Sequence, residues 1–368
     1  MGKQIETELL IVGGGAAGLC AASEAAAAGT HVLLVESDLH VGGQLIKQTH
    51  KFFGSQKEYA GTRGFEIAKI LMEEIKKLGS NICVLSNTTV NGYYPEEDIF
   101  TAMRGEEEFF WIKAKRCIIA TGAQEKILPF ANNDLPGVYG AGAVQTLANV
   151  YGVYPGRKVL MVGAGNIGLI VSYQLRQAGV EIAGIVEAAP KVGGYWVHAS
   201  KVRRLGIPIY LCHTVIRAVG QDKVEGAYIQ EVNEKFEPIG EEKFIDCDIV
   251  CMAVGLSPST ELFWQAECEM RFVPQLCGYV PLRDKEMRTS NSNVWVAGDA
   301  SGIEEASSAM IEGRIAGWSA AKSLGCQVDE RTFEDYWKRL KALRSGETGN
   351  KILAGIQQVW LEKEAQNG

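Results

Sequence analysis

The sequence has no apolar run close to the roughly 20 residues of a membrane-spanning helix. The best candidate, residues 9–29, is interrupted by three consecutive glycines and by Glu24. The sequence also lacks an excess of positive charge: 37 Lys and Arg against 44 Asp and Glu give a net charge of −7. That balance argues against nucleic-acid binding and against a polybasic membrane-surface protein. The first eight residues carry two Glu and no apolar core, so we expect no signal peptide and a cytoplasmic protein.

Cysteine is present but has no pattern: the nine cysteines form no CxxC pair, and nine is an odd number. Cys247 and Cys251 lie in an apolar, strand-like run, where small thiols are commonly buried. We therefore expect reduced structural cysteines and no metal site, with a scattered redox or metal role as the alternative. Proline is scarce, with ten residues against 42 glycines, and this glycine excess requires a backbone explanation.

Glycine is concentrated in two copies of one pattern, offset by 150 residues. Residues 9–18 (LLIVGGGAAG) and 159–168 (VLMVGAGNIG) each lead a short β-like run into GxGxxG. In each copy a helical segment follows, and a second apolar strand then ends in an acid, Glu36 or Glu187. Two further features are paired along the chain: the glycines at 42–43 and 193–194, and the segments IIATGA (118–123) and VCMAVG (250–255).

Each copy has the parts of a dinucleotide-binding unit, with the acid 18 or 19 residues after the third glycine. The first glycine makes the tight turn, the second lets the backbone approach a pyrophosphate, and the third allows helix and strand to pack closely. Phosphates are favoured at the helix N-terminus, and the acid accepts hydrogen bonds from a ribose diol. The alternative is a glycine-rich turn without a ligand, which carries more weight for the second copy because a duplicated domain can lose its nucleotide.

Short alternating strands between these motifs predict an antiparallel β-meander in each half. The segments concerned are 82–87, 88–94, 100–105, 108–114 and 116–122 in the first half, and 208–220, 224–232 and 248–255 in the second. Residues 62–79 have the spacing of an amphipathic helix. Residues 293–299 (NVWVAGD) predict a strand that ends at Asp299, ahead of a small-residue helix. An Asp in that place can accept a hydrogen bond from a polyol, while the helix N-terminus can face the pyrimidine side of a flavin.

In this order the motifs resemble the two-dinucleotide-binding flavoproteins, also called pyridine nucleotide–disulfide oxidoreductase-like flavoproteins, over roughly residues 7–325. The resemblance implies FAD on the first unit, with Asp299 on its ribitol, and NAD(H) on the second. The residues implied for FAD are Gly13, Gly15, Ala16, Ala17, Gly18, Glu36, Ser37, Gly43, Gln44, Ala120, Thr121, Gly122, Gly298 and Asp299. Those implied for NAD are Gly163, Gly165, Asn166, Ile167, Gly168, Glu187 and Gly255.

The chain departs from the disulfide reductases of that family. No cysteine lies in residues 42–54, which begin with the glycine pair, and none lies between Lys191 and Tyr210. A dithiol mechanism needs two close sulfurs, so the sequence argues against this activity. Residues 122–165, with GAxE, LPGV and GAxQ, are instead similar to the α-type subunits of amine-oxidising complexes such as sarcosine oxidase, opine oxidase, hydrogen cyanide synthase and hydroxyproline dehydrogenase.

Several candidates for specificity and chemistry remain open. Glu187 can bind a 2′-OH and would repel a 2′-phosphate, which favours NADH over NADPH. Lys191 is the one cation close to Glu187 in the sequence that argues the other way. Binding of ATP or ADP at this second unit is a lesser possibility. No catalytic residue is evident. Lys47 and His50 are weak candidates that could lie along the isoalloxazine and tune hydride acceptance, although either can equally be an ordinary polar loop residue. The helices of residues 331–361 either pack on the core or form a partner interface.

We expect an α/β fold of two Rossmann-type three-layer domains, each with an inserted antiparallel β-meander, plus a helical C-terminal tail. The expected FAD domain takes residues 1–130 and 263–330, the NAD(H) domain 131–262, and the helical extension 331–368. We expect noncovalent FAD and an enzyme that moves hydride between NAD(H) and flavin. A subunit for electron relay or assembly is the alternative. Either requires an acceptor: a small molecule, a quinone, oxygen, or a protein partner such as a second flavoprotein or an iron–sulfur protein. The sequence is also consistent with a homo-oligomer.

Overall fold

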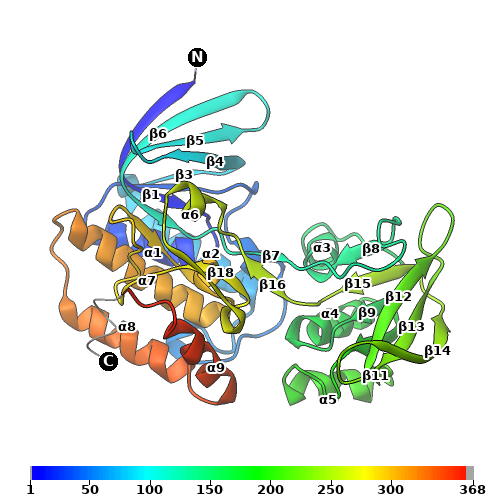
Figure 1. The fold of residues 1–368 in the computed structure, drawn as a ribbon. Coiled ribbons are helices and arrows are strands. Elements are labelled where there is room, and N and C mark those ends of the chain that lie inside the picture. The colour runs from blue at the N-terminus through cyan, green and yellow to red at the C-terminus, as the bar shows by residue number, and fades with distance from the viewer. Residues whose placement is uncertain (1, 362–368) are drawn as a thin grey trace. The chain divides into compact units, whose positions relative to one another are not determined.

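The computed structural model describes residues 2–361 and divides into two compact units (Figure 1). The first unit contains the residues up to Gln124 and those from Ser257 onward, and the second contains Glu125–Leu256. Residues 1 and 362–368, at the outer ends of the predicted FAD domain and helical extension, lie outside the described residues. The chain leaves the first unit through β7 (Ala123–Glu125) and returns through β16 (Leu256–Pro258).

The first unit is built on a seven-stranded sheet in the order β3-β2-β1-β6-β5-β4, with β19 beside β6. Strands β1, β2, β3, β6 and β19 pair with one another in parallel, whereas β4, β5 and the first half of β6 form an antiparallel meander. β17 and β18 form a separate hairpin. The strands are β1 (Lys3–Val12), β2 (Val32–Val35), β3 (Ile82–Leu85), β4 (Thr88–Tyr94), β5 (Ile99–Arg104), β6 (Glu108–Ile119), β17 (Met270–Val273), β18 (Gly278–Pro281) and β19 (Val294–Val296).

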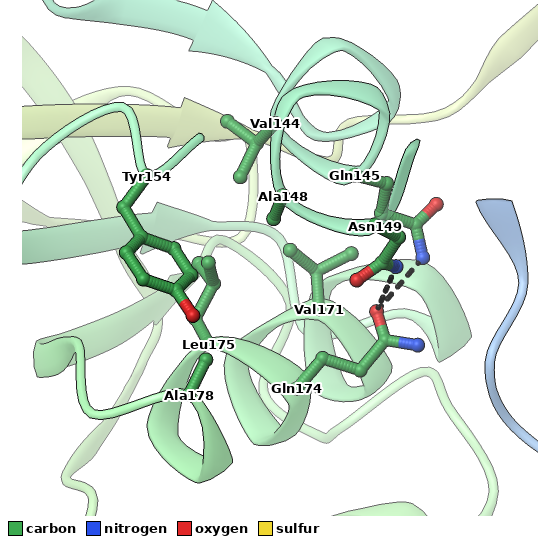
Figure 2. Close-up of a pocket in the computed structure, with 9 residues that line it drawn as sticks. All are labelled: Val144, Gln145, Ala148, Asn149, Tyr154, Val171, Gln174, Leu175 and Ala178. Atoms are coloured by element: carbon green, nitrogen blue, oxygen red, sulfur yellow. Dashed lines mark hydrogen bonds between the residues drawn. The ribbon is translucent and has the colours of Figure 1, made fainter. Parts of the chain in front are cut away.

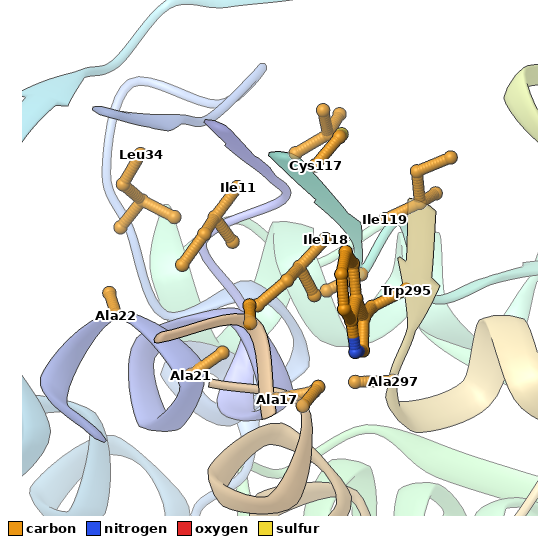
Figure 3. Packing of buried hydrophobic residues seen from close by; sticks show 14 of the residues in the cluster. Ile11, Ala17, Ala21, Ala22, Leu34, Cys117, Ile118, Ile119, Trp295 and Ala297 are labelled. Atoms are coloured by element: carbon orange, nitrogen blue, oxygen red, sulfur yellow. The ribbon is translucent and has the colours of Figure 1, made fainter. Parts of the chain in front are cut away.

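Small residues let two helices of the first unit pack closely against each other beside the sheet. A Cβ added at Gly313 would lie 2.1 Å from the carbonyl oxygen of Ala17, and one at Gly317 would lie 2.4 Å from that of Ala21, so α1 and α7 approach to backbone contact. Figure 3 shows Trp295 and Ile118 of the sheet beside the alanines of α1. The helices are α1 (Ala16–Ala27), α2 (Gly64–Lys77), α6 (Glu261–Gln265), α7 (Ala306–Ser323), α8 (Glu330–Leu343) and α9 (Glu347–Ile356), with 3₁₀ turns η1 (Gly43–Lys47), η2 (Gln56–Glu58), η3 (Gly79–Asn81), η5 (Pro274–Leu276) and η6 (Gly298–Ser301).

The second unit has three layers around a parallel sheet of order β11-β10-β9-β15-β8. Val159 and Met161 of β9 belong to the core under the helices, whereas Leu160 and Val162 belong to the core under the antiparallel meander β12-β13-β14. This alternation buries both faces of the sheet. The elements are β8 (Val138–Gly140), α3 (Ala141–Gln145), π-helix η4 (Thr146–Val150), β9 (Lys158–Val162), α4 (Asn166–Gln177), β10 (Glu181–Glu187), α5 (Trp196–Arg204), β11 (Ile209–Leu211), β12 (His213–Val219), β13 (Gly226–Val232), β14 (Pro238–Ile245) and β15 (Ile249–Met252).

The predicted fold class is confirmed: two Rossmann-like parallel sheets, a meander in each half, and C-terminal helices. Several local expectations differ from the structure. Segment 208–220 is not one strand, because the chain turns at Cys212 (φ +54°) and gives β11 to the parallel sheet and β12 to the meander. Segments 82–87 and 248–255 contain β3 and β15, which belong to the parallel sheets and not to the meanders. Segments 108–114 and 116–122 are not separate strands, because β6 continues without a break from Glu108 to Ile119 and serves both meander and parallel sheet. β14 is absent from the sequence prediction, because seven of its eight residues are exposed and its sequence has no apolar alternation. Within residues 2–361, no helix combines the length and apolar composition needed to cross a bilayer.

Candidate functional site

The first glycine turn lies between β1 and α1, and its three glycines have different surroundings. Gly13 has φ +104°, and a Cβ there would lie 2.3 Å from the carbonyl oxygen of Ala120. A Cβ at Gly18 would lie 1.8 Å from the carbonyl oxygen of Gly13. At Gly15 the nearest atom, the Cα of Gly43, is 3.9 Å away. The first and third glycines are therefore required by internal packing, and the second leaves the backbone open to an approaching ligand.

The N-terminus of α1 is suited to an anion. Gly15 is the N-cap residue; among the described residues no side chain caps the helix, and its first turn contains no acid. The first N–H groups of a helix have no partner within it, so they and the helix dipole are available to a phosphate. Ala16 and Ala17, two of the predicted FAD residues, occupy this first turn.

Glu36 follows β2 and braces the turn from one side. One carboxylate oxygen accepts a hydrogen bond from the Gly14 amide at 2.7 Å, and the other accepts from the Asp38 amide at 2.8 Å and the Ser37 hydroxyl at 3.1 Å. The glycine pair contacts the same turn, because the Gly42 amide donates to the Gly14 carbonyl at 2.7 Å. Gln44 follows in η1. Each carboxylate oxygen can accept more than one hydrogen bond, so Glu36 keeps capacity for a ribose hydroxyl.

Two further strand ends meet this turn at the carboxyl edge of the sheet. Ala120 follows β6, and the Thr121 hydroxyl and the Gly122 carbonyl are hydrogen-bonded to the backbone of Ser259. Gly298, in η6 after β19, approaches Ala17, since a Cβ at Gly298 would lie 2.8 Å from the Ala17 Cβ. The predicted FAD residues therefore come together around the N-terminus of α1.

Asp299 lies beside Gly298, and one of its carboxylate oxygens accepts from the Glu304 amide at 3.3 Å. Burial raises the pKa of its carboxyl to about 7; the Glu304 amide opposes this shift, and the carboxylates of Glu312, Glu304 and Glu305 add to it. Asp299 is a half-buried residue just after the strand end, and its carboxyl is suited to accept a hydrogen bond from a polyol such as ribitol.

A buried group of charges lies next to this turn. We call the side chains of Arg283, Glu304, Glu312 and Arg344 the ion cluster; each is at most 7% exposed. Glu312 accepts from the Gly298 amide at 3.1 Å and the Ser301 hydroxyl at 2.7 Å. These residues are missed by reasoning from the sequence, because they are far apart in the chain. The available signal is Glu312, a lone acid within the small and apolar residues of α7.

The second glycine turn, between β9 and α4, repeats the geometry of the first. Gly163 has φ +106°, and a Cβ there would lie 2.3 Å from the carbonyl oxygen of Ala253. A Cβ at Gly168 would lie 2.0 Å from the Gly163 carbonyl oxygen, whereas one at Gly165 would meet no atom within 4 Å. Among the residues described, α4 also has no side-chain cap at its N-terminus and no acid in its first turn.

The other predicted NAD residues lie around this second turn. Glu187 accepts from the Ala164 amide at 2.8 Å and the Ala189 amide at 2.9 Å, as Glu36 does in the first unit. Asn166 and Ile167 begin α4, and the Asn166 side-chain oxygen accepts from the Tyr195 amide at 2.8 Å. Gly255 follows β15, with φ +112°. The two acids, predicted as ribose ligands, therefore also hold the glycine turns.

Lys47 and His50 lie close to the first site in sequence. Lys47 ends η1, and the His50 ring stacks on Phe52 with a centroid separation of 5.6 Å. Their loop reaches the first turn of α7, since the Ser307 hydroxyl donates to the Phe53 carbonyl at 3.5 Å. This places the loop at the helix that follows Asp299, and it gives neither side chain a chemical role.

The cysteines do not form a dithiol site: all nine are free thiols, and none is paired in residues 2–361. Burial raises the pKa of Cys20 to about 11 and that of Cys247 to about 12, and it also raises the pKa of Cys117 and Cys251. Such thiols carry little thiolate at neutral pH and are poor nucleophiles. The described residues contain no cluster of three or more His, Cys, Asp or Glu that could hold a metal ion.

A small cavity of about 140 Å³ lies in the second unit between the α3–η4 segment and α4 (Figure 2). The Gln174 side-chain oxygen accepts from the Gln145 amide at 3.1 Å and from the Asn149 amide at 3.4 Å on one side of it. The cavity lies against the later turns of α4, whereas the glycine turn is at the start of that helix. The segment that is similar to the α-type subunits, residues 122–165, also has a structural role: the Glu125 carboxylate of GAxE accepts a hydrogen bond from the Gly142 amide of GAxQ at 2.7 Å.

Comparison with known proteins matches residues 7–313 to the family described as pyridine nucleotide-disulphide oxidoreductase. Among curated proteins, the chain is 28% identical to an opine oxidase subunit of Rhizobium meliloti, over 86% of this chain and 63% of that protein. It is 26% identical to the alpha subunit of sarcosine oxidase of Corynebacterium sp. (strain P-1), over 87% of this chain and 33% of that protein. The chain therefore spans less than two thirds of the length of these relatives.

Two solved structures share the fold. The L-proline dehydrogenase from P. horikoshii has a TM-score of 0.70 at 24% identity, over 93% of this chain and 60% of that one. The T. acidophilum thioredoxin reductase has a TM-score of 0.69 at 23% identity, over 86% of this chain and 98% of that one. At these identities the likeness concerns the fold alone.

Proposed function

The chain belongs to the pyridine nucleotide-disulphide oxidoreductase family, whose members typically bind FAD and a pyridine nucleotide, and on this premise we propose its particular function. We propose an FAD-dependent oxidoreductase that passes reducing equivalents between NAD(H) and flavin without a redox disulfide. We further propose that it works as the α-type subunit of an amine- or amino-acid-oxidising complex. The observation that carries the proposal is the duplicated turn: a Cβ on the second glycine would meet no atom closer than 3.9 Å, no side chain caps the helix N-terminus among the described residues, and an acid stands at the end of the next strand.

In the first unit we assign FAD to the α1 turn. The amides of Gly15, Ala16 and Ala17 would hold the pyrophosphate, Glu36 a ribose, and Asp299 the ribitol, while Gly43, Gln44 and the Ala120–Gly122 segment would line the site. Bound flavin would supply hydride or electron acceptance. The protein contributes position and a polar setting for it. The helix dipole of α7 adds positive potential after Asp299.

In the second unit we assign NAD(H) to the α4 turn, with Gly165, Asn166 and Ile167 at the pyrophosphate and Glu187 at the ribose. A carboxylate at that place would repel a 2′-phosphate, which favours NADH over NADPH. The helix after Glu187 carries Lys201, Arg203 and Arg204, but in its last turn rather than beside the acid.

Anaerobic reduction tests this proposal. The purified protein is loaded with FAD, and bleaching of the flavin absorbance is followed after addition of NADH or NADPH. We expect bleaching with both at saturation and a faster rate with NADH. A protein that takes up no FAD contradicts the first assignment, and faster bleaching with NADPH contradicts the role given to Glu187.

A role in electron relay or assembly is the second candidate, and the names of the relatives favour it, since opine oxidase and sarcosine oxidase are described by subunit. In that case a partner flavoprotein or iron–sulfur protein carries out the substrate chemistry. Purification from the native source distinguishes the two. A stable partner that is required for turnover supports the relay, and NADH turnover by the isolated chain with a quinone or oxygen supports the autonomous enzyme.

A further inference from the structure

The ion cluster is connected to the segment that carries Asp299 at both of its ends. Glu312 accepts from the Gly298 amide, just before Asp299, and the Glu304 amide donates to the Asp299 carboxylate. Arg344 contacts both acids: its Nε lies 3.0 Å from each Glu304 oxygen, and its Nη2 lies 2.5 Å from Glu312. The Asp299 segment is thus fixed by a residue 45 positions further along the chain.

Arg344 is brought to this place by α8, which also holds the loop carrying His50. Arg339 forms an ion pair with the buried Glu58, and Asp335 pairs with Lys57 at 3.2 Å. Both segments that flank the proposed flavin site therefore attach to one helix. That helix begins at Glu330, after the end of the family match at residue 313.

Stability alone does not account for the charges of the cluster. Buried ion pairs lose solvation, and apolar side chains of similar volume are often as stabilising or more so. α8 already has apolar anchors in the buried side chains of Tyr336 and Leu340. What an apolar residue at 344 could not do is compensate the two acids. Without Arg344, Glu312 would keep its ion pair with Arg283 at 3.4 Å, and Glu304 would lose the ion pair that it makes with Arg344.

We propose that Arg344 is a positioning residue of the flavin site, which acts through Glu304 and Glu312 to hold Asp299 in place for the ribityl chain and to limit the negative charge around it. This inference rests on the proposed FAD site in the first unit.

The charge effect predicts a pH signature. The groups facing Asp299 are the carboxylates of Glu304, Glu305 and Glu312, which raise its pKa, and the cluster also contains the guanidiniums of Arg283 and Arg344. An ionised Asp299 is the stronger acceptor, so FAD affinity should rise with pH and level off above the pKa of the free protein. Loss of Arg344 leaves a carboxylate uncompensated, which moves that inflection to higher pH.

The test is titration of the apoprotein with FAD at a series of pH values, followed by quenching of flavin fluorescence. The variants are Arg344→Gln, Arg344→Lys and the control Lys341→Gln, whose exposed side chain lies on the same helix. We expect Arg344→Gln to weaken FAD binding by about tenfold or more and to raise the inflection. Arg344→Lys should restore the inflection more than the affinity, because it keeps the charge and loses the bidentate geometry. Lys341→Gln should match the wild type.

The outcomes separate the two proposals. A wild-type chain that binds no FAD overturns the flavin site and this inference together. A wild type that binds FAD, with Arg344→Gln equal to it in affinity and inflection, overturns only the inference. If Arg344→Gln binds FAD more weakly but its pH inflection is unmoved, the inference is also overturned, because a merely structural loss would lower the affinity without moving the inflection. If Arg344→Gln does not fold, the pH inflection of FAD binding is measured for Arg344→Lys and Glu304→Gln instead and compared with that of the wild type.

Discussion

At the scale of single residues, the acid that follows β2 and the acid that ends β10 have a second role that their sequence position does not reveal. Both Glu36 and Glu187 accept a hydrogen bond from the amide just after the first glycine of their turn, at 2.7 and 2.8 Å. Each acid therefore holds its glycine turn in shape and also stands where a ribose would bind. Substitution at either position affects turn geometry as well as ligand contact, so a matched pair of variants is needed to separate the two sites.

Asp299→Ala and Glu187→Ala should have opposite phenotypes. Asp299→Ala removes a charge-assisted hydrogen bond to the ribityl chain, worth about 1.5–3 kcal/mol, and should weaken FAD binding roughly ten- to hundredfold. Glu187→Ala should keep the yellow colour and weaken NADH alone. Dialysis followed by absorbance measures FAD retention, and stopped-flow reduction measures the NADH dependence. Full FAD occupancy in Asp299→Ala, or swapped phenotypes, would show that the two nucleotides have been assigned to the wrong units.

At the scale of secondary-structure elements, the predictable parts are those with local signals. GxGxxG fixes strand, turn and helix within about 30 residues, and both copies form as expected. β14 could not be predicted, since a strand with almost every side chain exposed has no apolar alternation. The ion cluster could not be predicted for another reason: Arg283, Glu312 and Arg344 come from three separate segments, and only tertiary packing brings them together.

The second glycine turn offers a test in which packing and ligand access are separated. A Cβ at Gly168 would lie 2.0 Å from a backbone oxygen, so Gly168→Ala should destabilise the fold by about 1–3 kcal/mol. Gly165 has φ −72° and no atom within 4 Å of a Cβ, so Gly165→Ala should change stability by only about 0.5 kcal/mol. Its methyl group should nevertheless weaken NADH binding roughly tenfold or more, because it stands where a pyrophosphate approaches. Urea unfolding and NADH titration measure the two effects, and a stable Gly168→Ala would contradict the packing argument.

At the scale of the whole molecule, the division into two units has an energetic consequence. The first unit buries one large core and a small cluster between the β17–β18 hairpin and α9, and the second buries two cores on the two faces of its parallel sheet. Cores that do not share residues can unfold in separate transitions, and a single unfolding free energy then does not describe the chain. A ligand that binds one native unit stabilises that unit by mass action.

Calorimetry of the whole chain should therefore assign each nucleotide to its unit. At about 100 times its dissociation constant, a ligand contributes about 2.7 kcal/mol, which raises the midpoint of the affected transition by roughly 5–10 °C. We expect FAD to move one transition and NADH the other. Asp299→Ala should abolish the FAD shift alone, and Glu187→Ala the NADH shift alone, each variant serving as the control for the other. Each glycine turn belongs to a separate core, so two independent sites should act on different transitions. If both ligands moved the same transition, and the same variant abolished both shifts, the duplicated turns would not be two independent sites.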